Sequence, residues 1–157
     1  MKPRVYVETS VISYLTARPS GDPILFGQQE LTKSWWAHGA KLLELCCSDV
    51  VWDEASRGDK TAAALRTAQL EGLLDLPVTQ QSVDLAEKLL QAGALPQQAF
   101  ADALHVAVCA TNGVDILVSW NCKHIANAQI QRKLAEISFD FGYELPILCT
   151  PYELLGG

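Results

Sequence analysis

Four polar side chains stand out for the chemistry that they could perform: Glu8, Glu54, Asp102 and Asn121. Asp102 is the only charged residue in the run 99–110, so its helical face offers it no cationic partner. A carboxylate in such surroundings must be protonated or find a counterion elsewhere in the fold. Carboxylate oxygens are ligands that Mg²⁺ and Mn²⁺ prefer. The sequence therefore predicts that Glu8, Glu54 and Asp102 hold a divalent ion, with Asn121 supporting the ion or its water shell.

An alternation of strands and helices must bring these residues together. The expected strands cover residues 4–8, 48–52, 73–78, 115–120 and 146–149. A first helix is expected directly after Thr9-Ser10, followed by a loop over 17–29. Further helices are expected over 30–47, 53–57, 61–71, 81–91, 97–111 and 126–141. This order predicts an α/β fold, a three-layer α/β/α sandwich with a mainly parallel central sheet, in one domain spanning 1–157. Ligands of such sheets bind beyond the carboxyl ends of the strands. Glu8, Glu54 and Asn121 are all expected there.

Each of these residues also has a purely structural explanation. Glu8 and Glu54 could stabilise the N-termini of the helices that follow them. Asp102 could be a buried carboxylate that other protein groups satisfy. His105, one helical turn after Asp102, is interpreted as a core histidine rather than a ligand, and Asp53 and Asp115 as solvated.

Composition limits the kind of molecule. The chain has 157 residues, 49% of them hydrophobic, which is enough to bury a core. It shows no apolar stretch long enough to cross a bilayer and no signal peptide, so we expect a cytoplasmic protein without a membrane partner. A net charge of −6 argues against a general nucleic-acid-binding surface. Any contact with RNA must therefore be local.

The five cysteines are odd in number, scattered and mostly set among apolar neighbours. We interpret them as buried free thiols. Cys122 with His124 is the only hint of ligand spacing for zinc, and it lacks a second pair.

Four segments resemble, in order, the successive acidic motifs of PIN domains: residues 5–12, 48–56, 101–107 and 117–124. The likeness covers essentially the whole chain and is greatest to the VapC-type toxins of bacterial toxin–antitoxin modules. It implies an α/β/α sandwich and Mg²⁺- or Mn²⁺-dependent endoribonuclease activity. It also implies a homodimer and neutralisation by a small antitoxin protein.

The chain departs from this family pattern at two positions. The first motif usually has Asp, where this chain has Glu8, whose side chain reaches one methylene further. The last motif usually has Asp, where Asn121 offers an oxygen without negative charge. The loss of one acid weakens the case for a second metal ion. Ser10 and Ser119 match polar family positions and are expected to assist through hydrogen bonds.

Contacts with RNA need cations near the acidic residues. The candidates are Arg57, Lys60, Lys123 and Arg18, any of which could equally be ordinary solvated surface. Trp35 and Trp36 are adjacent and cannot share one helix face, so we expect one in the core and the other at a dimer or antitoxin interface.

Two other functions are compatible with parts of this sequence. Asn121 would suit a PIN-like module that has lost catalysis and binds RNA or protein. A phosphotransferase of the haloacid-dehalogenase kind would need an Asp nucleophile after the first strand, and Glu8-Thr9-Ser10 does not supply one.

Overall fold

The computed structural model of the chain describes residues 1–156 and has a parallel sheet at its centre. The strands are β1 (Arg4–Val7), β2 (Glu44–Ser48), β3 (Leu74–Leu76), β4 (Ile116–Val118) and β5 (Ile147–Cys149), in the spatial order β3-β2-β1-β4-β5. Every neighbouring pair is parallel. All the strands therefore end at the same edge, where an α/β sheet places its ligand site.

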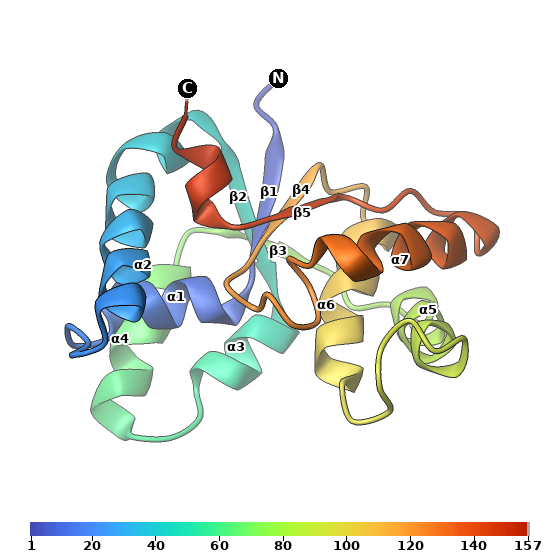
Figure 1. The fold of residues 1–157 in the computed structure, drawn as a ribbon, viewed down its shortest axis with the longest axis horizontal. Coiled ribbons are helices and arrows are strands. Elements are labelled where there is room, and N and C mark those ends of the chain that lie inside the picture. Colours follow the sequence, from blue (N-terminus) through green and yellow to red (C-terminus); the bar gives the residue numbers. More distant parts are fainter. Residues whose placement is uncertain (157) are drawn as a thin grey trace.

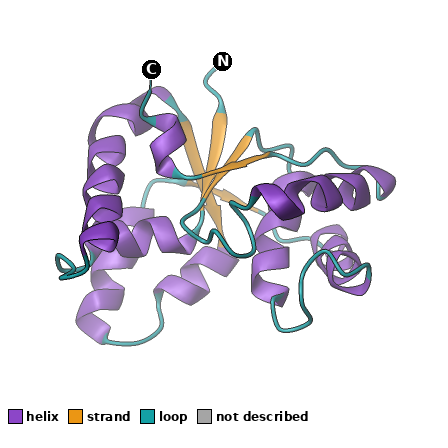
Figure 2. Ribbon diagram, viewed as in Figure 1, coloured by secondary structure: helices purple, strands orange, loops and turns teal. Residues whose placement is uncertain are grey.

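Helices cover both sides of this sheet, which confirms the predicted three-layer α/β/α sandwich (Figures 1 and 2). One group consists of α1 (Thr9–Thr16), α2 (Pro23–Ser34), α3 (Asp49–Ala55) and α4 (Lys60–Leu70). The other consists of α5 (Gln80–Gln91), α6 (Phe100–Thr111) and α7 (Ala128–Asp140). The central strand β1 is buried between them, with Val5, Tyr6 and Val7 fully inaccessible to solvent.

The segment between α1 and α4 differs from the sequence prediction. Residues 17–29 are not all loop, because Asp22 caps α2 by accepting hydrogen bonds from the backbone of Ile24 and Leu25. Pro23 occupies the first helical position, where its missing N–H costs nothing. A π-helical turn (Trp35–Gly39) and a 3-10 turn (Ala40–Leu42) then end the helical region.

The predicted strand over 48–52 is also wrong, since that segment begins a helix. The strand is β2, whose Cys46 and Cys47 are fully buried next to β1. Ser48 caps α3 by accepting a hydrogen bond from Val50 N. Glu54 therefore lies in the last turn of α3 and not directly after a strand, as the sequence suggested.

The remaining elements agree with the prediction to within a few residues at their ends. Gly72 and Gly93 follow the ends of α4 and α5 with φ angles of 84° and 75°, a conformation that other residues rarely adopt. Within residues 1–156, no helix has the length and apolar character needed to cross a membrane.

The cysteine prediction holds for four of the five thiols. All five are free; Cys46, Cys47, Cys109 and Cys149 are buried, whereas Cys122 is exposed. Burial raises the pKa of Cys46, Cys47 and Cys149 to about 12.

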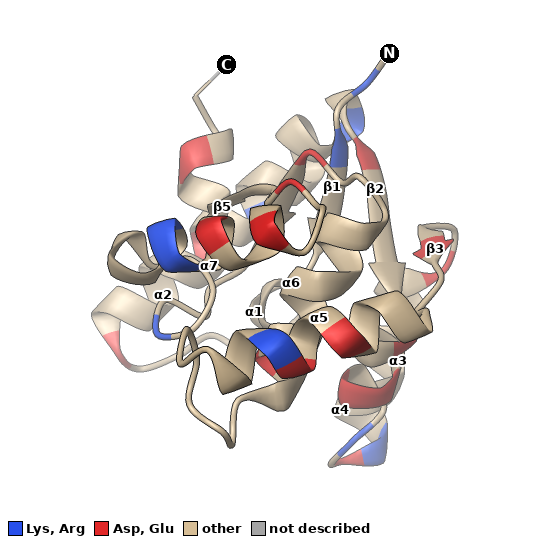
Figure 3. Ribbon diagram, turned by 90° about the vertical axis from the view of Figure 1, so that its right-hand side faces the viewer, with Lys and Arg blue, Asp and Glu red and all other residues tan. Residues whose placement is uncertain are grey.

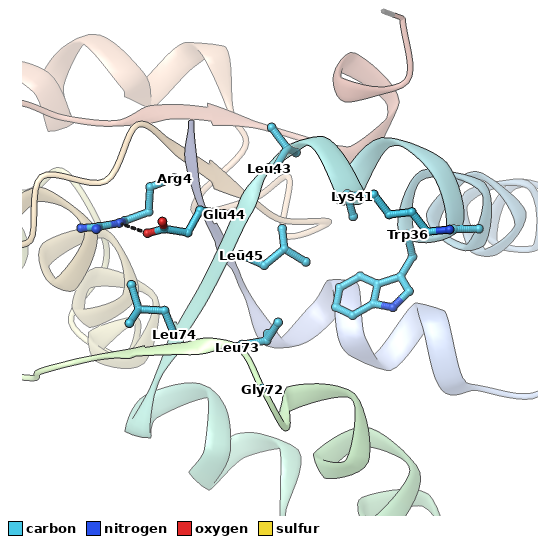
Figure 4. Close-up of a pocket in the computed structure, with 11 residues that line it drawn as sticks. Arg4, Trp36, Lys41, Leu43, Glu44, Leu45, Gly72, Leu73 and Leu74 are labelled. Atoms are coloured by element: carbon cyan, nitrogen blue, oxygen red, sulfur yellow. Dashed lines mark hydrogen bonds and ion pairs between the residues drawn. The ribbon is translucent and has the colours of Figure 1, made fainter. Parts of the chain in front are cut away.

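Trp35 and Trp36 separate as expected, one into the core and one toward the surface. Trp35 is fully buried, whereas Trp36 is half-buried and lines a groove of about 1110 Å³ beside Leu45 and Leu73. Figure 4 shows its indole ring facing the two leucines, in the groove that Arg4 and Glu44, the first residues of β1 and β2, also line. An interface at Trp36 remains a prediction.

Candidate metal centre

Glu8 connects β1 to α1 and is buried, with only 5% of its surface exposed to solvent. Its backbone is extended, and its side chain accepts a hydrogen bond from Ser10 N at 3.1 Å, which caps α1. The hydroxyls of Ser10 and Ser119 both donate to Glu8 Oε1 at 2.5 Å. The structure thus places the two serines expected to assist directly on this carboxylate. Three hydrogen bonds therefore fix the orientation of the Glu8 carboxylate.

Glu54 reaches the same region from the end of α3. Its Oε1 accepts hydrogen bonds from Thr9 Oγ1 at 2.7 Å and from His105 Nε2 at 2.5 Å. Burial raises the pKa of the Glu54 carboxyl, but the hydrogen bond and charge of His105 outweigh this effect, with help from Thr9 and the charge of Arg57. The net pKa is lower than usual, so Glu54 is ionised at neutral pH.

His105 is fully buried on α6, as a core histidine should be, and it links Glu54 to the sheet. Its Nδ1 is 2.8 Å from the hydroxyl of Tyr6, which lies 2.7 Å from Ser48 Oγ. The result is a buried chain of hydrogen bonds from β2 through β1 and α6 to Glu54. Such a chain fixes the histidine ring and, through it, the carboxylate.

Glu8, Glu54 and His105 form a group whose potential ligand atoms all lie within 4.8 Å of one another. Sequence reasoning brought Glu8 and Glu54 together but assigned His105 to the core alone. The signal was present, because His105 follows Asp102 by one helical turn and therefore shares its face of α6. Asp102 itself is outside this group among the residues described.

Asp102 lies in the first turn of α6 and has a partner that the sequence did not reveal. Its Oδ2 is 2.8 Å from Nδ1 of His124, in the loop after β4. The side chains are 23% and 18% exposed, respectively. Burial has the largest effect on the pKa of His105 and lowers it. The hydrogen bond to Glu54 raises this pKa, and the negative charge of Asp102 raises it by a smaller amount. Asp102 is thus close enough to influence the group electrostatically.

Asn121 is used within its own loop. Its side-chain Oδ1 accepts a hydrogen bond from His124 N at 3.0 Å, and its backbone N–H donates to Ser119 Oγ at 2.9 Å. The side chain of Asn121 thus fixes the turn that carries His124. It does not supply a fourth charge.

The cations proposed for RNA contacts are all solvent-exposed: Arg18, Arg57, Lys60 and Lys123. Of these, Arg57 acts on the centre most clearly, since its charge lowers the pKa of Glu54. Figure 3 shows the Lys and Arg positions scattered along the ribbon among the Asp and Glu positions. Asp53 and Asp115 are exposed, and Asp115 accepts a hydrogen bond from Arg4 N at 2.8 Å.

Comparison with known proteins supports the fold and shows no family. No protein-family model and no curated protein sequence matches the chain. The crystal structure of Mycobacterium tuberculosis VapC20, described as a sarcin-ricin loop cleaving toxin, is similar with a TM-score of 0.58 and 20% sequence identity, over 76% of this chain and 92% of that one. A tyrosyl-tRNA synthetase from Archaeoglobus fulgidus, with 14% identity over 95% of this chain and 55% of that one, reaches a TM-score of only 0.43, which supports no inference. At this identity, the likeness to VapC20 shows a shared fold.

Proposed function

We propose that this chain is a metal-dependent endoribonuclease of the PIN type and the toxin of a toxin–antitoxin pair. The observation that carries the proposal is the meeting of Glu8, Glu54 and His105 within 4.8 Å at the carboxyl ends of the strands. The fold shared with VapC20 supports the same reading.

The carboxylates of Glu54 and Asp102 fit a divalent ion because in each of them protein donors bond to only one of the two oxygens. Thr9 and His105 both bond to Oε1 of Glu54, and among residues 1–156 no donor bonds to its Oε2. Asp102 likewise receives His124 on Oδ2 and no described donor on Oδ1. Hard carboxylate oxygens are the ligands that Mg²⁺ and Mn²⁺ prefer. We assign Glu8 and Glu54, which the structure brings together, as ligands. Asp102, whose carboxylate lies outside this group, is assigned as the third ligand, which a bound ion would draw in, and Asn121 as their support.

Within this proposal the protein residues hold and orient the carboxylates. Ser10 and Ser119 fix Glu8, while Thr9 and His105 fix Glu54. A bound ion would supply an activated water for attack on a phosphodiester bond and offset the charge that develops on the phosphate. Arg57, Lys60 and Lys123 would contact the RNA backbone locally, which the net charge of −6 requires.

RNA cleavage in the presence and absence of Mg²⁺ or Mn²⁺ tests this function. We expect cleavage by the wild type only with metal, and a loss of about 100-fold or more in Asp102→Ala, since a bound ion stabilises the transition state by several kcal/mol. Asp140→Ala, which removes an exposed carboxylate at the end of α7, is the matched control and should retain activity. Equal, metal-independent cleavage by wild type and Asp102→Ala would remove the proposal.

A second candidate function is a binding module that has lost catalysis. The observation in its favour is Asn121, whose side-chain oxygen serves the loop and brings no charge to the centre. A calorimetric titration with Mn²⁺ separates the two functions, since a module without metal affinity would release no heat and gain no protection against melting.

The substrate and partners follow from the same proposal. VapC20 is described as cleaving the sarcin-ricin loop, so a structured RNA stem-loop is the first substrate to assay. A cognate antitoxin protein and a homodimer are the expected partners, and the cytoplasm is the expected location. A short gene for a DNA-binding protein directly upstream would support the pairing with an antitoxin.

A further inference from the structure

The loop after β4 holds His124 in a defined position. Asn121 fixes this loop twice: its Oδ1 accepts from His124 N, and its backbone carbonyl accepts from Ile125 N at 3.1 Å and Ala126 N at 2.9 Å. Ile125, directly after His124, is fully buried and anchors the turn in the core. The imidazole of His124 is therefore presented from a rigid turn and not from a mobile surface segment.

The imidazole of His124 meets Asp102 with a specific atom. A carboxylate can only accept, so Nδ1 of His124 carries the hydrogen that bonds to Oδ2 at 2.8 Å. Both side chains are more than three-quarters shielded from solvent, which makes the hydrogen bond stronger than an exposed one. This contact restricts the rotation of the carboxylate and leaves Oδ1 without a donor among the described residues.

Glu54 has the same arrangement on the other side of the centre. His105 donates from Nε2 to Oε1 of Glu54, and within residues 1–156 no donor bonds to the second oxygen. In metal sites, such hydrogen bonds to ligating carboxylates orient the ligand and tune its affinity for the ion. His105 and His124 thus occupy equivalent positions with respect to two different candidate ligands.

We propose that His124 is a positioning residue for Asp102, and that Asn121 acts through His124 by fixing its turn and not by binding the ion itself. This inference rests on the proposed function, because it gives Asp102 the role of a ligand. It also explains how the chain can retain a metal site with Asn121 in place of the acid that PIN domains usually have there.

Mn²⁺ affinity, measured for the full-length chain by electron paramagnetic resonance of the free ion, tests this role independently of catalysis. We expect His124→Ala to raise the Kd for Mn²⁺ by about tenfold or more. His124→Asn, whose amide nitrogen can replace Nδ1, should restore most of the affinity. Asn121→Ala should weaken binding in the same direction. Cys122→Ala, at an exposed position in the same turn, is the matched control and should bind as the wild type does.

A double-mutant cycle shows whether His124 acts through Asp102. In an Asp102→Ala background, His124→Ala should cause no further loss of Mn²⁺ affinity, since the residue that it orients is gone. Additive losses would overturn the inference.

The binding data also separate this inference from the proposed function. If wild type binds Mn²⁺ and both His124→Ala and Asn121→Ala bind it as tightly as wild type does, the inference is wrong and the proposed function stands. If wild type binds no Mn²⁺, the proposed function fails first. Should His124→Ala not fold, Asn121→Ala alone decides by the same criterion.

Discussion

At the residue scale, the carboxylates of the candidate metal centre are oriented by uncharged hydroxyls and by two histidines. Glu54 depends on Thr9 and on His105, and Asp102 depends on His124. The sequence identified Asp102 because a charged residue in an apolar run needs an explanation, and Glu8 and Glu54 because they were expected at the ends of strands. It could not identify their donors, because a histidine or threonine on an amphipathic helix has many possible partners. His124 lies 22 residues from Asp102, and only the folded chain brings them together.

Removal of one hydroxyl should expose the importance of the buried hydrogen-bond chain. Tyr6→Phe leaves His105 Nδ1 and Ser48 Oγ without their shared partner in the core, so we expect a loss of about 1–3 kcal/mol in the free energy of unfolding. Tyr14→Phe is the matched control, since Tyr14 is only half-buried on α1. Urea unfolding of both variants measures the difference, and equal stabilities would show that the Tyr6 hydroxyl is not part of a required chain.

The pair of His105 and Glu54 should make stability depend on pH. Burial lowers the pKa of His105, but bonding to Glu54 and the nearby acids raise it above its ordinary 6.5. The stability that His105 adds to the folded state is therefore fully present below pH 6.5, and it is lost as the pH rises through the higher pKa of the folded protein. The pKa of Glu54 is lowered from 4.5, so its contribution is present above pH 4.5 and is lost as the pH falls through the folded pKa.

These two shifts define a window for measurement. The difference in unfolding free energy between wild type and His105→Gln should be largest between pH 4.5 and 6.5 and should shrink at higher pH. Urea titrations in buffers across this range provide the curve. A difference that stays constant up to about pH 9 would show that His105 does not titrate with a raised pKa in the fold.

At the element scale, the sequence predicted the alternation of strands and helices correctly from 60 onward but not between 17 and 58. The apolar run Val50-Val51-Trp52 favours a strand by residue type, yet Ser48 caps a helix there and Val51 provides its buried face. Conversely, Cys46 and Cys47 are fully buried residues of β2, although a preceding helix was predicted through them. Short apolar runs fit a strand or a buried helix equally well, and tertiary packing decides between them.

The helix that begins at Pro23 gives this correction a direct test. Asp22→Ala removes the side chain that accepts from Ile24 N at 2.9 Å and Leu25 N at 3.1 Å, so we expect destabilisation by about 1 kcal/mol. Glu87→Ala, an exposed carboxylate inside α5, should change stability much less. Thermal unfolding of the two variants compares them, and an Asp22→Ala protein as stable as wild type would contradict a capped helix start there.

At the scale of the whole molecule, burial divides the thiols into two classes. Cys122 is exposed, whereas Cys46, Cys47, Cys109 and Cys149 are buried. Burial raises the pKa of all five thiols, so exposure to the reagent is what distinguishes Cys122. The thiolate is the reactive form, so buried thiols with high pKa values react slowly. We therefore expect one thiol per folded chain to react rapidly with a disulfide reagent at pH 8, and five after denaturation.

Cys122→Ser is the control for this count, because it should abolish the rapid phase and leave four thiols in denaturant. Rapid reaction of two or more thiols in the native protein would contradict the burial of the other four cysteines in the structure.

The central claim at this scale is that folding brings residues 8, 54 and 102, from three separate segments, to one divalent ion. Anomalous diffraction from crystals soaked in Mn²⁺ tests it most directly. We predict a manganese peak with carboxylate oxygens of Glu8, Glu54 and Asp102 at about 2.1–2.2 Å, the usual range for such small hard cations. A fully occupied peak bound by other residues, or none at saturating Mn²⁺, would contradict the account.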